Sequence, residues 1–219
     1  MDKLRLRFKK TGRAIYISHL DLMKTVQRAF SRAGYVLKYS EGFNPRPQLS
    51  FALPLSVGTG SVCEVLDFKL KDDAPLDDMP ARLTAALPEG IEFIEVYGPT
   101  RKVSEIKWLE ISGIMEYDNE APAEMAGKLS AFYAAEAIVI TKRTKRGEAE
   151  TDIKSAIQAI EFSPAEGGVQ VHAVISAQEP TLNPELLTDA LRQKAPNLAP
   201  DFAKYMRLET FDTQMTVFR

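Results

Sequence analysis

The residues of this chain best suited to chemistry lie together in YISHLDLMK, residues 16–24. His19, one of only two histidines, stands between a hydroxyl residue and an aspartate. Because imidazole titrates near neutral pH, His19 is a candidate general acid or base, with Tyr16 or Lys24 assisting. A structural interpretation competes: Ser18 followed three residues later by Asp21 forms a capping box for a helix that starts there. Only His19 then lacks a structural task, and the helix N-terminus would place it to meet an anion.

A second candidate is the loop EGFNPRPQLS, residues 41–50. Its two prolines stiffen the backbone, so Asn44 and Arg46 can present donors to a phosphate or carboxylate at little ordering cost. The alternative is a rigid corner between two extended segments, with Arg46 merely solvated.

The charge is distributed unevenly along the chain. Residues 1–47 contain eleven Lys or Arg and three Asp or Glu, a formal charge of +8, whereas the remaining 172 residues carry −10. This asymmetry predicts that the N-terminal part either meets a polyanion such as RNA or pairs with acidic residues of the same protein.

Two rows of cations account for much of this excess. The alternation in LRLRFK predicts a strand whose cations, Lys3, Arg5, Arg7 and Lys9, point away from its apolar residues. These cations either contact RNA or form cross-strand pairs with Asp67 or Glu92. The helix predicted from about Ser18 to Ala33 carries Lys24, Arg28 and Arg32 at intervals of four residues, on its outer face.

The order of predicted elements determines the fold class. The order strand, helix, strand, strand, helix, strand occupies residues 1–98. The same order is predicted to recur after it, with strands at IKWLEISGIMEY, AIVITKR, VQVHAVISA and KYMRLETF. This is the ferredoxin-like βαββαβ pattern of the α+β class. We therefore predict two ferredoxin-like domains, residues 1–100 and 101–219, with an insertion around 147–168; one continuous α+β domain is the alternative.

Composition excludes several classes of function. The single cysteine, Cys63, cannot build a Cys-rich zinc or iron–sulfur site, and no dinucleotide or phosphate-loop motif is present, so we expect neither a metal nor another cofactor. Cys63 and His172 lie in apolar strand patterns and are predicted to be packing residues. No apolar run is long enough to span a membrane, which favours a cytoplasmic protein without a membrane partner.

Two segments, YISHLDLMKTVQRAFSRAG and YSEGFNPRPQLSFALPLSVG, closely resemble the N-terminal signature of the radical-SAM-linked proteins, a bacterial domain family of unknown function. The matching residues are His19, Asp21, Gly42, Asn44, Pro45, Pro47, Ser50 and Phe51. Family members commonly have histidine where this chain has Arg46, which keeps an anion donor but removes a possible metal ligand or general base. The CxxxCxxC motif of radical SAM enzymes is absent, so the resemblance implies a partner of such an enzyme.

We therefore expect a non-catalytic adaptor that works with a radical SAM enzyme and binds RNA or an RNA-associated substrate in RNA or ribosome modification. The predicted ligand or RNA contacts are His19, Asn44, Arg46, Lys24, Arg28, Arg5 and Arg7. One alternative is a metal-independent RNA endonuclease similar to the CRISPR-associated tandem ferredoxin-like nucleases. Its candidate catalytic residues would be His19, Tyr16 and Lys24. Another is a module that binds a small molecule or peptide.

Overall fold

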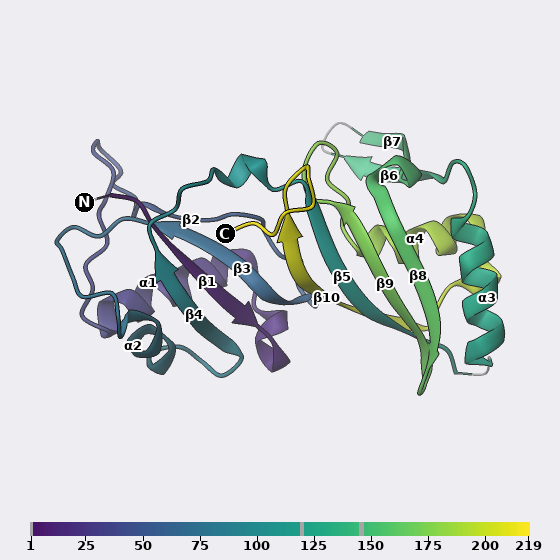
Figure 1. The fold of residues 1–219 in the computed structure, drawn as a ribbon, viewed down its shortest axis with the longest axis horizontal. Helices are drawn as coiled ribbons and strands as arrows, with labels where there is room; N and C mark the ends of the chain where they lie inside the picture. Colours follow the sequence, from purple (N-terminus) through teal and green to yellow (C-terminus); the bar gives the residue numbers. More distant parts are fainter. Residues whose placement is uncertain (1, 119–120, 145–146) are drawn as a thin grey trace. The chain divides into compact units, whose positions relative to one another are not determined.

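The computed structural model describes residues 2–118, 121–144 and 147–219. The chain divides into two compact units: unit 1 consists of Met1–Val103 with Arg219, and unit 2 of Ser104–Phe218. Figure 1 labels the helices and strands of both.

Unit 1 is a four-stranded antiparallel sheet with two helices. Its elements are β1 (Leu4–Lys10), the 3-10 helix η1 (Gly12–Tyr16), α1 (His19–Arg32), β2 (Leu49–Phe51), β3 (Gly60–Phe68), α2 (Met79–Ala85) and β4 (Ile91–Tyr97). The strands pair in the order β4, β1, β3, β2. Since every neighbouring pair is antiparallel and each helix connects strands that are not neighbours, the unit is ferredoxin-like, as predicted.

Both helices of unit 1 cover the same face of its sheet. The alternation in β1 directs Leu4, Leu6 and Phe8 into one buried cluster. The helix residues in that cluster are Leu22, Val26 and Phe30 of α1 and Met79 and Leu83 of α2. Arg5, Arg7 and Lys9 of β1 therefore point to the opposite face of the sheet, as the alternation predicts.

Unit 2 has the same order with one additional hairpin. Its elements are η2 (Val103–Glu105), β5 (Trp108–Glu116), α3 (Pro122–Tyr133), β6 (Val139–Thr144), β7 (Gly147–Asp152), η3 (Lys154–Ala156), β8 (Ile157–Ala165), β9 (Gly168–Ser176), α4 (Glu185–Lys194), η4 (Pro196–Leu198) and β10 (Phe202–Phe211). The main strands pair antiparallel in the order β10, β5, β9, β8. This order corresponds strand by strand to that of unit 1.

The predicted second strand of unit 2 needs correction. AIVITKR does form a strand, β6, but β6 pairs with β7 in a separate two-stranded sheet (Figure 1). The second strand of the main sheet is β8, which lies within the range 147–168 that was predicted to be an insertion. The inserted element is the β6–β7 hairpin. Both segments have strand composition, and only their pairing distinguishes the core strand from the inserted one.

Candidate nucleic-acid interface

The cations of β1 pair with acids of unit 1. Arg5 is fully buried and its Nε donates to Asp67 Oδ1 at 2.6 Å, while Nη2 reaches Oδ2 at 3.1 Å. Lys3 shares the same carboxylate. Arg5, predicted as an RNA contact, is therefore corrected to a structural residue, because its guanidinium is buried and engaged.

Arg7 and Lys9 follow the same pattern. Arg7 Nη1 lies 2.6 Å from Glu95 Oε1, and Lys9 Nζ lies 3.5 Å from Glu92 Oε2. The Arg7 side chain is largely buried, so it too is poorly placed for RNA. Cross-strand ion pairs, the alternative to RNA contact, therefore account for this row of cations. Their share of the +8 charge is neutralised by acids of unit 1.

The cations of α1 are different. Lys24, Arg28 and Arg32 line a groove of about 700 Å³ along the helix, which we call the α1 groove. Its other lining residues are Gln27, Ser31, Gly34, Tyr35, Val36, Leu37 and Tyr39. Lys24 lies 3.8 Å from Asp21, a distance typical of a weak surface pair, and within the described chain Arg28 forms no ion pair. The row therefore presents positive charge to the solvent.

The far end of the groove is fixed by backbone contacts and stacking. Arg32 donates to the carbonyl of Ala86, and Arg82 donates to the carbonyl of Ala33 at 2.6 Å. The Arg82 guanidinium also lies 4.9 Å from the centre of the Tyr35 ring, a cation–π contact. Burial raises the pKa of Tyr35, and the charge of Arg82 opposes that rise only in part. Tyr35 thus remains a neutral wall of the groove.

A hairpin, residues 39–47, borders the groove. A bridge pairs Tyr39 with Pro47, and Ser40 N donates to the carbonyl of Arg46 at 2.8 Å. Arg46 N in turn donates to Ser40 Oγ at 3.0 Å. Gly42, with φ of 117°, supplies the turn that a side chain would strain. The loop is therefore a closed hairpin and not a simple corner between strands.

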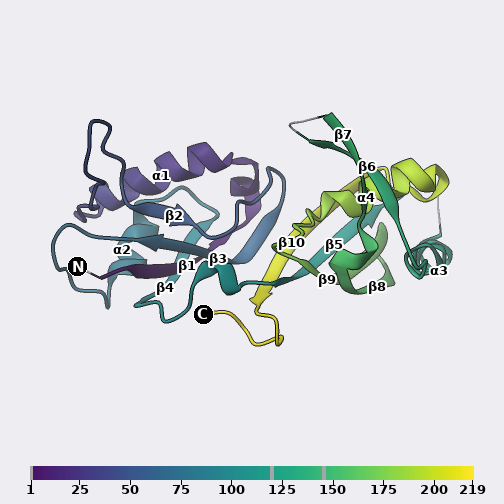
Figure 2. The same ribbon diagram turned by 90° about the horizontal axis from the view of Figure 1, so that it is seen from above.

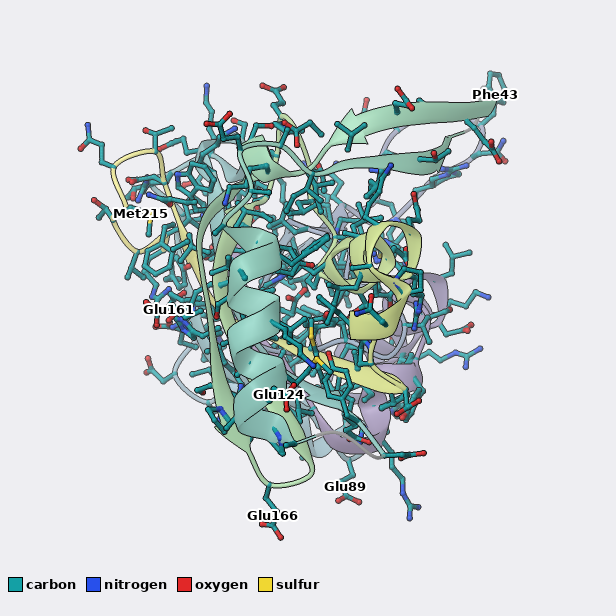
Figure 3. All side chains as sticks on the ribbon, turned by 90° about the vertical axis from the view of Figure 1, so that its right-hand side faces the viewer. Phe43, Glu89, Glu124, Glu161, Glu166 and Met215 are labelled. Atoms are coloured by element: carbon teal, nitrogen blue, oxygen red, sulfur yellow. The ribbon has the colours of Figure 1, made fainter. Side chains whose placement is uncertain are left out.

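The hairpin exposes polar and aromatic side chains together. Asn44 and Arg46 are exposed, so their donors are accessible to a ligand. Tyr39 is about half exposed, and Phe43 at the tip is fully exposed; Figure 3 shows the Phe43 side chain at the periphery of the molecule. Sequence reasoning missed both aromatics. The sequence does contain a signal for them: two aromatic residues, Tyr39 and Phe43, lie between the cations Lys38 and Arg46 in a turn-forming segment.

Ser18 and Asp21 cap α1. Ser18 Oγ accepts from the backbone N–H of Asp21 at 3.2 Å, which confirms the predicted cap. The reciprocal bond differs from the prediction: Ser18 Oγ lies 2.8 Å from Asp21 Oδ2 and donates to that carboxylate. Lys10, a buried residue, fixes the preceding segment by donating to the carbonyls of Ile15 and Ile17, and burial lowers its pKa against the attraction of Glu64.

His19 packs against an aromatic ring. Its imidazole meets Phe51 edge to face, with ring centres 5.4 Å apart, and Phe51 in turn packs on Phe8 of the core. The residue is partly buried, so it has the structural task that the sequence left unassigned.

His19 and the hairpin lie at opposite ends of β2. Phe51, the partner of His19, is the last residue of β2, whereas Asn44 and Arg46 precede its first residue. Figure 2 shows the hairpin at the C-terminal end of α1, away from η1 and the helix start. The structure therefore does not bring His19 together with Asn44 and Arg46, although all three were predicted as ligand or RNA contacts.

Tyr16 and Lys24, the other candidate catalytic residues, gain no support from the geometry. Tyr16 is exposed in η1, before the helix, and Lys24 lies five residues after His19, so it projects from a different side of α1. Lys24 lines the α1 groove together with Arg28 and not with His19.

The second histidine and the cysteine have different environments. Cys63 is buried, as predicted. His172 was predicted to be a packing residue, but its side chain is 47% exposed and its Nε2 lies 2.8 Å from Glu110 Oε1. In β9 the inward positions are Val171 and Ala173, so the strand alternation turns His172 outward.

Two further findings concern the described residues as a whole. They contain no cluster of three or more His, Cys, Asp or Glu side chains placed to hold a metal ion. Among them, every helix is too short or too polar to cross a membrane.

Fold and site define the class: a tandem ferredoxin-like protein with a cationic groove on its first unit. Residues 3–193 match the family described as "Uncharacterized protein conserved in bacteria (DUF2344)", and the chain belongs to this family. The predicted membership of a bacterial family of unknown function is thereby confirmed. No curated protein matches the chain.

Twenty chains of solved structures match this fold. One belongs to the structure entitled "Crystal Structure of a Cbf5-Nop10-Gar1 Complex", with a TM-score of 0.53 and 12% sequence identity. The match covers 94% of this chain and 48% of that one, so this chain spans about half its length. At this identity the likeness shows the fold alone.

Proposed function

We propose that this protein binds RNA through the α1 groove and the adjoining hairpin, as a non-catalytic partner of a radical SAM enzyme. The observation that carries the proposal is the contrast between the two rows of cations. The row on β1 is paired with acids, whereas Arg28 in the groove and Arg46 in the hairpin form no ion pair within the described chain. Exposed cations on an ordered surface are what a phosphate backbone requires.

The chemistry of the groove favours binding over catalysis. Its lining consists of cations, amide and hydroxyl donors, two tyrosines and small or apolar residues, without a histidine or a carboxylate. Proton transfer at neutral pH usually employs one of those two groups. His19, the residue best suited to it, packs on Phe51 instead.

RNA and the enzyme partner are inferred from different premises. The exposed cations of the groove support a polyanion as the ligand, and the exposed aromatic rings of the adjoining hairpin support RNA as that polyanion. The partner enzyme rests on the resemblance alone. Affinity purification of the full chain at native expression should recover a radical SAM protein; its absence would refute the partnership and leave the RNA-binding proposal intact.

RNA binding is tested by fluorescence anisotropy across a salt series. Three groove cations that neutralise phosphates should give a slope of log K against log salt of roughly −2, at about −0.7 for each contact on a single strand. The double variant Lys24→Glu/Arg28→Glu should lose most of the affinity and flatten the slope.

The single groove variant Arg28→Glu has a control of equal charge change in Arg13→Glu, which reverses one exposed cation of η1 outside the groove. The Arg13→Glu control should retain the affinity of the wild type. Equal losses in the control and the groove variant would mean that net charge alone attracts RNA, and binding that does not depend on salt would refute the proposal.

A further inference from the structure

We infer that the α1 groove takes single-stranded RNA, with phosphates along α1 and unpaired bases stacked on Phe43 and Tyr39. This inference rests on the proposed function and adds the kind of RNA and how its bases are held. It commits to a single strand because the groove combines exposed cations with the ring of Tyr39, and the hairpin that begins at Tyr39 exposes the ring of Phe43.

The phosphate side of the site is the cation row. Lys24, Arg28 and Arg32 are spaced by four residues, so successive cations are displaced by about 6 Å along the helix axis. This displacement is close to the separation of neighbouring phosphates in an extended strand. Because all three side chains line the same groove, a strand laid along α1 meets them in sequence.

The base side of the site is the hairpin. Tyr39 lines the groove, and the side chain of Phe43 is fully exposed, at the edge of the molecule in Figure 3. A fully exposed phenyl ring forfeits the free energy that burial would provide, and within the described residues neither Tyr39 nor Phe43 packs on another ring. Base stacking on such rings is tolerant of sequence and is the usual means of holding single strands.

The hairpin also has little entropy to lose on binding. Its backbone is already closed by the Tyr39–Pro47 bridge and by the bonds between Ser40 and Arg46. Pro45 and Pro47 restrict it further. The rings are therefore presented on a preorganised support, which lowers the cost of binding.

A duplex could use only half of this site. Its bases are stacked on one another inside the helix, so a duplex offers phosphates to α1 but no free base to Phe43. The ratio of the affinities for single strand and duplex therefore measures the contribution of base stacking separately from that of charge.

The experiment compares two probes on the full chain. One is a labelled uridine oligonucleotide of about 12 nucleotides, a length within the range of known single-strand sites, and the other is the same strand annealed to its adenosine complement. Phe43→Ala should weaken binding of the single strand roughly 5- to 150-fold and leave binding of the duplex unchanged. Phe43→Trp should restore it.

Leu20→Ala is the matched control, because Leu20 is another exposed apolar residue, at the opposite end of α1. It should leave both affinities unchanged. Equal affinity for the two probes, with no effect of Phe43→Ala but a loss with Arg28→Glu, would overturn the stacking inference and retain RNA binding.

Two other outcomes overturn the inference in different ways. If the wild type binds neither probe, the proposed function fails as well. If poly-glutamate displaces the uridine strand at equal charge concentration and Phe43→Ala has no effect, the groove recognises an acidic protein instead of RNA.

Discussion

The first helices of the two units, α1 and α3, occupy the same position in the same fold but differ in charge. α1 carries three cations against the single acid Asp21. α3 carries one cation, Lys128, which lies 2.7 Å from Glu124 and through this hydrogen bond lowers the pKa of the Glu124 carboxyl. The fold requires only the buried stripe of each helix, so the exposed stripe is free to differ. In unit 1 that freedom yields the exposed cation row that we propose as an RNA-binding surface.

The hairpins of the two units also occupy the same position in the fold but differ in what they contact. Each unit inserts a hairpin between its first helix and its second strand. The β6–β7 hairpin is attached to α4, because Gln193 exchanges two hydrogen bonds with the backbone of Thr141. The hairpin of unit 1 is closed by its own bonds and leaves Phe43 exposed. The same insertion point thus serves packing in one unit and exposure in the other.

The largest predicted effect separates structural cations from binding cations. Asp67→Asn leaves Arg5 buried without its carboxylate and should lower the free energy of unfolding by about 3–5 kcal/mol. Arg28→Ala, on the exposed row, should change it by less than about 0.5 kcal/mol. Urea unfolding of both variants checks the contrast. Similar values for the two would mean that the pairing on β1 has no structural role.

Alkaline pH should test the buried tyrosines of unit 2. Burial raises the pKa of Tyr117 to about 12 and raises the pKa values of Tyr133 and Tyr205 as well. Above pH 10 the unfolded chain loses phenolic protons that the folded chain keeps, so this stabilisation is complete below pH 10 and declines above it.

By about pH 12 Tyr117 alone should lower the free energy of unfolding by roughly 2 kcal/mol, and Tyr133 and Tyr205 should add to that fall. Urea unfolding at rising pH, followed by tyrosinate absorbance, measures it. The variant Tyr133→Phe should show a smaller decline. Titration of all tyrosines near pH 10 in the native protein would contradict the prediction.

His19, at the start of α1, should contribute to stability and not to RNA binding. His19→Ala removes the contact with Phe51 and should cost about 1 kcal/mol of stability, without changing RNA affinity. A double-mutant cycle with Phe51→Leu isolates the contact and should give a coupling of about 0.5–1.5 kcal/mol. A loss of RNA affinity with unchanged stability would return His19 to the binding site.

The smallest expected effect comes from making α3 more like α1. Glu124→Lys removes the acid of α3, and because the pair is exposed the stability should remain nearly unchanged. RNA affinity should also remain nearly unchanged, since α3 has no exposed aromatic hairpin beside it. A marked gain in RNA affinity would mean that exposed cations on a helix are sufficient for RNA binding without aromatic residues beside them.

Much of the fold could be predicted from sequence because the relevant signals are local. The alternation of Leu4, Leu6 and Phe8 indicates a strand with one buried face, and Ser18 with Asp21 indicates where α1 begins. The same local signals cannot distinguish which of AIVITKR and IQAIEFSPA is the strand of the main sheet. Both are rich in strand-forming residues, and pairing with β9 rather than composition makes the second of them a core strand.

The candidate site was predicted only in part for the same reason. The sequence by itself determined the charge excess, the cation row of α1, the helix cap and the stiff loop, because each depends on neighbours within a few residues. Only the tertiary structure decided that Arg5 meets Asp67, that His19 meets Phe51, and that Arg46 lies at the other end of β2 from His19. Those contacts join residues distant in sequence, where a small difference in strand pairing determines whether a cation is buried or left for a ligand.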